Sequence, residues 1–226
     1  MGKYILKRIA LAIVTIWAVA TITFFLMNLV PGGPFLSEKA ISPAATKALE
    51  AKYGLDKPMA ERYFTYISDA AHGDFGDSLK QRGRTVMDII ATKFPVSARL
   101  GGMAVVLALC VGVPLGVLAA YKRGTFIDSL FSVIATCGIA VPGFVICTLL
   151  LYVFGVKLQW LPTLGLKSAQ SYIMPVVALA AYPTSYIMRL MRSSMLDVLG
   201  QDYMRTAKAK GLSQKVSLFK HALRNA

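Results

Sequence analysis

The side chains with the clearest potential for a specific interaction lie at the end of the chain, from Gln201 to Ala226. Helix formers occupy 203–210, Gly211 suits a left-handed helix cap, and Ser213 suits the N-cap of a second helix. Basic side chains surround small ones: Lys208, Lys210, Lys215, Lys220 and Arg224 around Thr206, Ala207, Ala209 and Gly211. The pattern predicts a basic helical hairpin that either rests on anionic lipid or docks into a soluble partner.

Residue patterns that would indicate catalysis are missing from the sequence. It contains no G-x-x-x-x-G-K-[S/T] phosphate loop, no nucleophile elbow and no H-E-x-x-H zinc motif. His72 and His221 are far apart, and Cys110, Cys137 and Cys147 show no C-x-x-C spacing. We therefore expect no catalytic residue, no metal site, no cofactor bound by this chain and no nucleic-acid partner.

The composition is typical of a membrane protein. The 226 residues carry a net charge of +14, 56% of them are apolar, and only 16% are charged. Four stretches without a charged residue exceed the roughly 20 residues that cross a bilayer core: 9–37, 100–121, 129–156 and 168–188. We predict an all-α, polytopic membrane helical bundle with four transmembrane helices. A soluble helical core would need polar faces that these stretches lack.

Basic residues at the ends of the four stretches predict the orientation. They gather in three regions: Lys3, Lys7 and Arg8 before the first stretch, Lys122 and Arg123 between the second and third, and Arg189, Arg192 and the hairpin after the fourth. Because basic residues mark the cytoplasmic side, the N-terminus and the hairpin are expected in the cytoplasm. The first stretch is too long for a signal-peptide core, so we expect it to remain in the protein.

These boundaries divide the chain into eight predicted parts. They are an N-terminal tail with the first transmembrane helix (1–30), an external helical segment (31–95), a second transmembrane helix (96–121), a cytoplasmic loop (122–129), a third transmembrane helix (130–156), an external loop (157–170), a fourth transmembrane helix (171–191) and the cytoplasmic hairpin (192–226). In the external segment, Pro43 and Pro58 are each expected to open a helix, the first at 44–53. A third helix, at 85–94, is expected to lie along the membrane surface.

Glycine and proline interrupt the predicted third span at Gly138, Pro142 and Gly143. Such breaks persist in membranes where neighbours or a water-filled cavity satisfy the freed backbone groups. We predict that these three residues line a translocation path; the alternative is close packing of small residues between helices. No ionisable residue lies in the middle of a span, so energy for uphill transport is expected to arrive from outside the spans.

Four groups of residues together resemble one known family. They are 4–8 with 30–32, then 53–58 with Tyr63 and 73–78, then 112–117, and finally 201–213 with 221–226. With these residues the chain resembles the membrane permease subunit of ATP-binding-cassette importers, specifically the B-type subunit of the dipeptide/oligopeptide/nickel family. The match at 201–213 is long and specific.

The resemblance implies a role for the hairpin. In this family a short cytoplasmic helix sits in a groove on the ATP-hydrolysing subunit, and its position here is 202–211. The residues implied in coupling are Asp202, Tyr203, Arg205, Thr206, Ala207, Lys210 and Gly211. Small Thr206 and Ala207 would allow close docking. Arg205 stands where the broader importer pattern E-A-A-x-x-x-G has an acidic residue.

The resemblance also implies partners and a location. The implied partners are a second related permease, two ATPase subunits that bind ATP and Mg²⁺, and an external solute-binding protein, in a bacterial or archaeal cell membrane. Peptides are the implied cargo, with nickel, glutathione or another small solute as alternatives. A secondary carrier and a membrane scaffold are alternatives of another class.

Family members typically have six spans, with the coupling loop between the fourth and the fifth. The resemblance therefore implies two further spans beyond Ala226. We expect this chain to be truncated before them and unable to close a translocation path alone.

Overall fold

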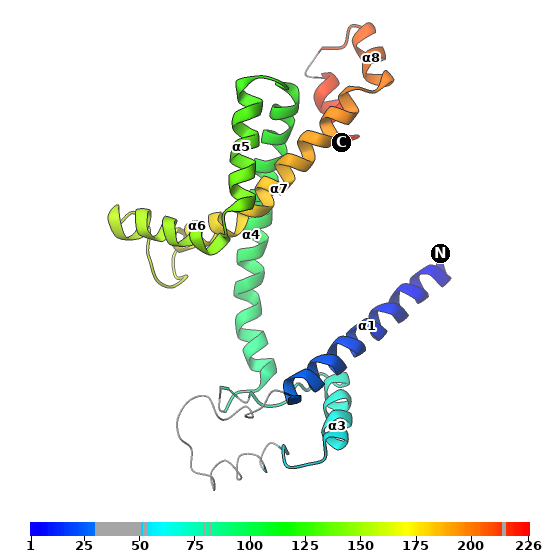
Figure 1. The fold of residues 1–226 in the computed structure, drawn as a ribbon, viewed down its shortest axis with the longest axis vertical. Coiled ribbons are helices and arrows are strands. Elements are labelled where there is room, and N and C mark those ends of the chain that lie inside the picture. Colours follow the sequence, from blue (N-terminus) through cyan, green and yellow to red (C-terminus); the bar gives the residue numbers. More distant parts are fainter. Residues whose placement is uncertain (30–50, 52–53, 79, 82, 214–215) are drawn as a thin grey trace. The chain divides into compact units, whose positions relative to one another are not determined.

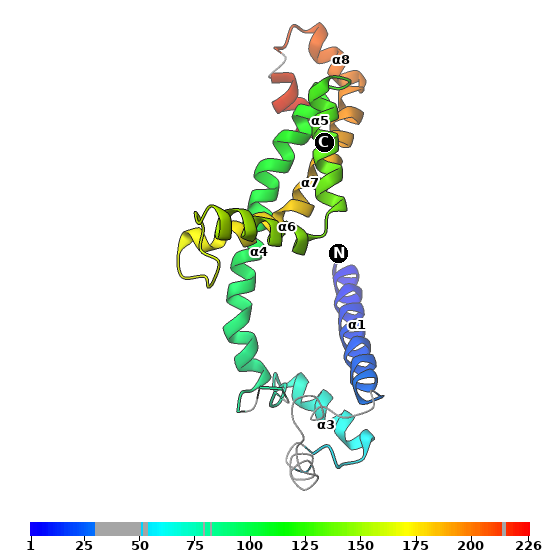
Figure 2. The same cartoon turned by 60° about the vertical axis from the view of Figure 1, so that its left-hand side comes forward.

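The computed structural model describes residues 1–29, 51, 54–78, 80–81, 83–213 and 216–226, without the side chains of Lys208 and Lys220. These residues form two units, Met1–Phe94 and Pro95–Ala226, whose helices are drawn in Figures 1 and 2. Every regular element in the described ranges is a helix, as predicted, apart from one isolated bridge between Asp77 and Thr85. The helix predicted at 44–53 falls outside these residues, apart from Ala51.

The first unit begins with α1, Gly2–Leu29, which buries none of its residues in this chain. A helix that is apolar on all sides suits a bilayer, where lipid covers the side chains that water would not. The next described helix is α3, Met59–Ala71, which starts directly after Pro58 as predicted. Pro58 is the N-cap residue, with φ −54° and ψ 140°, where its missing N–H removes no hydrogen bond of the helix.

Polar and aromatic contacts hold α3 against the last turns of α1 (Figures 1 and 2). The Tyr63 hydroxyl is hydrogen-bonded to Thr21 Oγ1 at 2.7 Å, and Arg62 Nη2 donates to Asn28 Oδ1 at 2.6 Å. The Tyr63 ring also meets Phe24 with its centroid 5.5 Å away. The predicted external helix is therefore fixed to the end of the first predicted span.

The helix α4 runs without interruption from Val86 to Tyr121. The sequence predicted two elements here, a surface helix at 85–94 and a span at 96–121; the structure joins them into one. Pro95 and Pro114 both lie inside α4. A proline removes one helical hydrogen bond but does not have to end a long apolar helix, because neighbouring groups can satisfy the freed carbonyl.

In the second unit, α4 packs on α7, Ile173–Leu199, through a stripe of buried small residues. A Cβ atom added to Gly112 would lie 2.8 Å from the Thr184 carbonyl oxygen, and one added to Gly116 would lie 2.6 Å from that of Met188. The backbones therefore approach too closely at these points for any side chain. Figures 1 and 2 show α4, α5 and α7 side by side in this unit.

The segment 130–156, predicted as one transmembrane helix, is two helices. The first is α5, Phe126–Ala140, and the second is α6, Gly143–Leu150, which continues as η1, Leu151–Lys157. The two arms meet at an angle of 102°. Val141 is extended, with φ −81° and ψ 122°, because the residue before a proline avoids the helical region.

Three helices in the described residues are long and apolar enough to cross a membrane: Gly2–Leu29, Val86–Tyr121 and Ala169–Leu199, in which α7 follows the short helix η2, Ala169–Tyr172. The bent pair of α5 and α6–η1 makes a fourth if both arms count as one span. The chain is thus a multi-pass helical membrane protein.

Candidate functional site

The C-terminal hairpin consists of two short helices. The first is α8, Asp202–Ala209, and the second is η3, Ser217–Ala222. Gly211 between them has φ +75°, which confirms the predicted left-handed turn. Ser213 Oγ accepts the Val216 N–H at 3.5 Å, a long bond in the position expected of an N-cap.

A small apolar core attaches this hairpin to the ends of α4 and α7. Its buried members come from four elements: Ala120, Met195, Val198, Met204 and Ala222. Met195 and Met204 are the largest side chains in the described residues that are almost fully buried. Because Met204 belongs to α8 and Met195 to α7, α8 and the end of α7 share one buried core.

The predicted coupling residues lie on both faces of α8. The side chains of Asp202, Tyr203, Arg205, Thr206 and Lys210 are exposed, as is Gly211. Arg205 lies 3.6 Å from Asp202 in an exposed ion pair one turn apart, and Thr206 Oγ1 donates to the Asp202 carbonyl oxygen at 3.1 Å. These exposed residues form the outer face of α8, the surface that a partner can reach.

Ala207 is placed differently from what the sequence suggested. Its residue is only 6% exposed, so it does not offer a partner a close approach. Ala207 follows Met204 by three residues, and both therefore lie on the inner face of α8. The small side chain lets α8 pack closely on its own chain.

An ion pair that the sequence analysis missed joins α5 to α7. Arg192 Nε donates to Asp128 Oδ1 at 2.6 Å, and Arg192 Nη2 donates to Asp128 Oδ2 at 2.8 Å. Asp128 Oδ2 also accepts the backbone N–H of Gly124 at 3.0 Å, from the turn between α4 and α5. Two parallel charge-assisted hydrogen bonds fix both distance and orientation.

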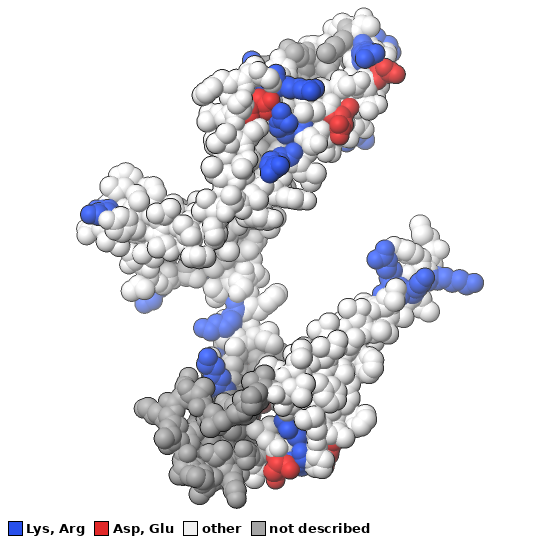
Figure 3. All heavy atoms as spheres, viewed as in Figure 1, with Lys and Arg blue, Asp and Glu red and all other residues white. Residues whose placement is uncertain are grey.

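The ion pair lies next to the hairpin core on α7. Asp128 is buried and Arg192 is partly buried. Arg192 lies one helical turn before Met195, so α7 carries the ion pair and the hairpin core on adjacent turns. Figure 3 shows charged side chains gathered around the α4–α5 turn, the end of α7 and α8, while most of the remaining visible face of this unit is uncharged.

The sequence contained a signal for the ion pair. Arg192 is one of the basic residues that predict the orientation, and Asp128 lies in the predicted loop 122–129. An acidic residue in an otherwise basic loop, next to an apolar stretch, indicates a paired carboxylate because an unpaired one would be costly there. Its partner is 64 positions away, too far for a local pattern to identify.

Two of the three predicted path residues lie at the bend, and the third lies in a helix contact. Pro142 and Gly143 begin α6, where both are exposed. A Cβ atom on Gly138 would collide with the Ser185 hydroxyl of α7, so Gly138 serves close packing of α5 on α7. The translocation path itself stays a prediction. Among the described residues, no group of three or more His, Cys, Asp or Glu side chains is arranged to hold a metal ion.

Comparison with known proteins places the chain in a family. The family described as binding-protein-dependent transport system inner membrane component matches residues 112–226, and the N-terminal part of such membrane components matches 1–101. The oligopeptide transport system permease protein OppB of Salmonella typhimurium is 44% identical over 100% of this chain and 74% of its own length. The dipeptide transport system permease proteins DppB of Bacillus subtilis and Lactococcus lactis are 43% and 39% identical over 100% of this chain, and the match covers 73% and 74% of their lengths. The chain therefore belongs to the family of inner membrane components of binding-protein-dependent transport systems.

Proposed function

We propose that this chain is a permease subunit of an ATP-driven importer of peptides, and that its hairpin receives the movement of an ATPase subunit. Its relatives named above are permeases of oligopeptide and dipeptide transport systems, which supports peptides as the cargo. The proposed partners are a second related permease, two ATPase subunits that bind ATP and Mg²⁺, and an external solute-binding protein. This chain itself performs no catalysis in that scheme.

The observation that carries the coupling proposal is the division of α8 into two faces. The inner face, with Met204 and Ala207, is buried against the chain. The outer face, with Arg205 and Thr206, is exposed. A partner that grips the outer face therefore moves the inner face, and with it the end of α7.

The ion pair extends this connection to a second helix. Arg192 of α7 is bonded to Asp128 of α5 through two short hydrogen bonds. When α7 moves, it must therefore either break these bonds or move α5 with it. At the other end of α5 lies the bend at Val141 and Pro142. We propose that movement of α8 reaches this bend through α7 and α5, and that the bend, with Pro142 and Gly143, borders the translocation path.

The coupling proposal is tested on the outer face in the complete transporter. Arg205→Glu reverses an exposed charge and should weaken co-purification of the ATPase subunits and lower ATP-dependent peptide uptake. The thermal stability of the permease should not change, because exposed ion pairs contribute little. The matched control is Lys167→Glu, an exposed charge reversal between η1 and η2, which should leave co-purification of the ATPase subunits at the wild-type level. If the Arg205→Glu variant assembles and takes up peptide as the wild type does, the outer face of α8 does not belong to the coupling interface.

The energy source and the cargo need separate measurements. Reconstituted with a hydrolysis-deficient ATPase, the transporter should take up no peptide even when an ion gradient is present; uptake under that condition would favour a secondary carrier. The cargo is identified by measuring which unlabelled compound, a peptide, nickel or glutathione, inhibits the uptake of a labelled peptide. In a variant whose three native cysteines are replaced by serine, Arg205→Cys should react with a membrane-impermeant thiol reagent only from the cytoplasmic side, which tests the proposed orientation.

A further inference from the structure

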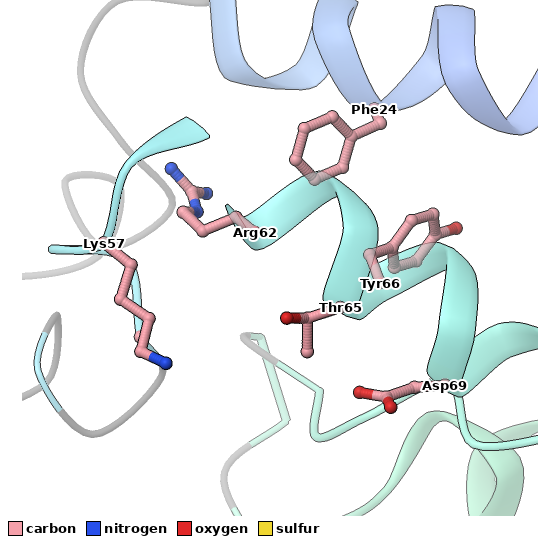
Figure 4. Close-up of a pocket in the computed structure, with 7 residues that line it drawn as sticks. Phe24, Lys57, Arg62, Thr65, Tyr66 and Asp69 are labelled. Atoms are coloured by element: carbon pink, nitrogen blue, oxygen red, sulfur yellow. The ribbon is translucent and has the colours of Figure 1, made fainter. Parts of the chain in front are cut away.

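A polar pocket of 260 Å³ lies beside the end of α1 in the Met1–Phe94 unit. Figure 4 shows its main lining residues, Phe24, Lys57, Arg62, Thr65, Tyr66 and Asp69. Four of these come from α3, and Phe24 comes from α1. The hairpin belongs to the other unit, Pro95–Ala226, and the coupling proposal makes no use of this pocket.

The polar side chains on one face of α3 run from a cation through a neutral hydroxyl to an anion. Arg62, Thr65 and Asp69 follow one another at intervals of three and four residues, which places them on one side of α3. In Figure 4 the guanidinium, hydroxyl and carboxylate groups point to the side of α3 on which Lys57 lies. The pocket thus has a cationic end and an anionic end, which suits a ligand that carries both charges.

The cationic end is held in place by other contacts. Arg62 Nη2 donates to Asn28 Oδ1 at 2.6 Å, and the Asn28 side chain itself donates to the Phe24 carbonyl oxygen at 2.7 Å. Lys57 Nζ is held by Glu61 Oε1 at 2.8 Å. A guanidinium has five N–H donors, so Arg62 keeps donors for an anion after binding Asn28. The ion pairs among the described residues do not involve Asp69.

The surroundings of the pocket indicate where it lies in a membrane. Phe24 precedes the end of α1 by five residues, or about 8 Å along the helix axis. Aromatic rings gather at this level, since Phe24 lies 5.5 Å from Tyr63 and 5.7 Å from Tyr66 between ring centroids. Tyrosine is enriched where a membrane helix meets the headgroup layer. Leu26 and Leu29, in the same turns of α1, are exposed apolar side chains.

We propose that this pocket binds the headgroup of a phosphatidylethanolamine-type membrane lipid. The phosphate lies at Arg62 and Lys57, the ammonium group donates to Asp69 and Thr65, and the acyl chains follow the apolar surface of α1. Phosphatidylglycerol carries the same phosphate charge, but its headgroup offers Asp69 only hydroxyl donors and no cation. A choline headgroup has no N–H with which to donate to Asp69.

Native mass spectrometry of the purified chain with phosphatidylethanolamine, phosphatidylglycerol and phosphatidylcholine of matched chain length tests the proposal. The wild-type chain should bind phosphatidylethanolamine about tenfold more tightly than either other lipid, because one charge-assisted hydrogen bond distinguishes them. Asp69→Asn should remove most of this preference, and Asp69→Glu should keep it. Arg62→Gln should weaken binding of all three lipids, because all three carry the phosphate; Lys57→Gln tests the same end without touching the Asn28 contact.

The control variant is Asp74→Asn, which makes the same change outside the pocket, at a carboxylate that accepts the Gly76 N–H at 2.8 Å. Its lipid preference should equal that of the wild type. Equal affinity for the three lipids in the wild type, or an unchanged preference in Asp69→Asn, overturns the proposal. Displacement of the lipid by soluble glycerophosphoethanolamine at equal concentration also overturns it, because the pocket would then be a site for a soluble zwitterion.

Discussion

Two aspartate–arginine pairs in the second unit are built in opposite ways. Asp128 and Arg192 join α5 to α7 through two hydrogen bonds of 2.6 and 2.8 Å, and Asp128 is buried. Asp202 and Arg205 are one turn apart in the same helix, 3.6 Å from each other, and both side chains are largely exposed. The first pair fixes two helices to each other, whereas the second leaves both side chains free to meet a partner.

This contrast suggests a division of labour between the inner and the outer parts of the coupling region. The inner part comprises the ion pair, the hairpin core and the close contacts of α4 with α7, and it holds one arrangement. The outer face of α8 contributes little to the stability of the chain. The proposed coupling needs both properties, because an ATPase subunit that binds the outer face can move α7 only if the inner part keeps its arrangement.

The largest effect is expected at the buried pair. Asp128→Asn leaves the partly buried Arg192 guanidinium without its counter-charge and should lower the stability of the chain by about 3 kcal/mol. Thermal and denaturant unfolding in detergent measure this loss. In a double-mutant cycle with Arg192→Gln, the two changes should be strongly non-additive; additive losses would show that the two side chains do not depend on each other.

A second effect separates the two faces of α8. Ala207→Trp places a large ring in the buried inner face and should destabilise the chain by about 2 kcal/mol. Thr206→Trp, on the neighbouring exposed position, should leave the unfolding midpoint unchanged. Equal stability of the two variants would mean that Ala207 faces outward, as the sequence analysis had assumed.

A somewhat smaller effect tests the contact of α4 with α7. Gly116→Ala adds a methyl group that would lie 2.6 Å from the Met188 carbonyl oxygen, and it should cost about 1–2 kcal/mol as the helices move apart. Gly102 lies in the same helix with no neighbouring atom within 4 Å of an added methyl group. Gly102→Ala should therefore stabilise α4 slightly, because alanine is the better helix former. If Gly116→Ala and Gly102→Ala change the stability of the chain by the same amount, Gly116 makes no tight contact with α7.

The smallest effect is expected at the exposed pair. Asp202→Asn removes one charge of a solvent-exposed pair and should not change the unfolding midpoint in detergent. If Asp202→Asn lowered the stability as much as Asp128→Asn does, the exposed pair would stabilise the chain as strongly as the buried pair, and the contrast between them would be wrong.

Local sequence signals predicted much of this architecture. Stretches without charge located the membrane helices, Pro58 located the start of α3, and Gly211 located the turn of the hairpin. Each of these features follows from nearby residues, through the need to satisfy backbone groups or through the conformations that glycine and proline allow. The family resemblance rested on the same kind of local motif and is confirmed by the comparisons.

Features that depend on distant residues were not predictable in this way. The sequence suggested an interruption near Pro142, but the angle between α5 and α6 depends on how each arm packs on α7. The partner of Asp128 lies 64 positions away. A small residue such as Ala207 fits equally well against its own chain or against another, and only the three-dimensional packing distinguishes the two.

The central claim is that movement of α8 reaches α5 through α7 and the Asp128–Arg192 pair. The most direct test is the number of peptides imported per ATP hydrolysed by the complete transporter in proteoliposomes, with Asp128→Asn in this subunit. In the complexes that do assemble, ATP hydrolysis per complex should equal that of the wild type, but the ratio should be lower by about tenfold, the scale of a typical coupling free energy between sites. A wild-type ratio in the assembled variant would contradict the central claim.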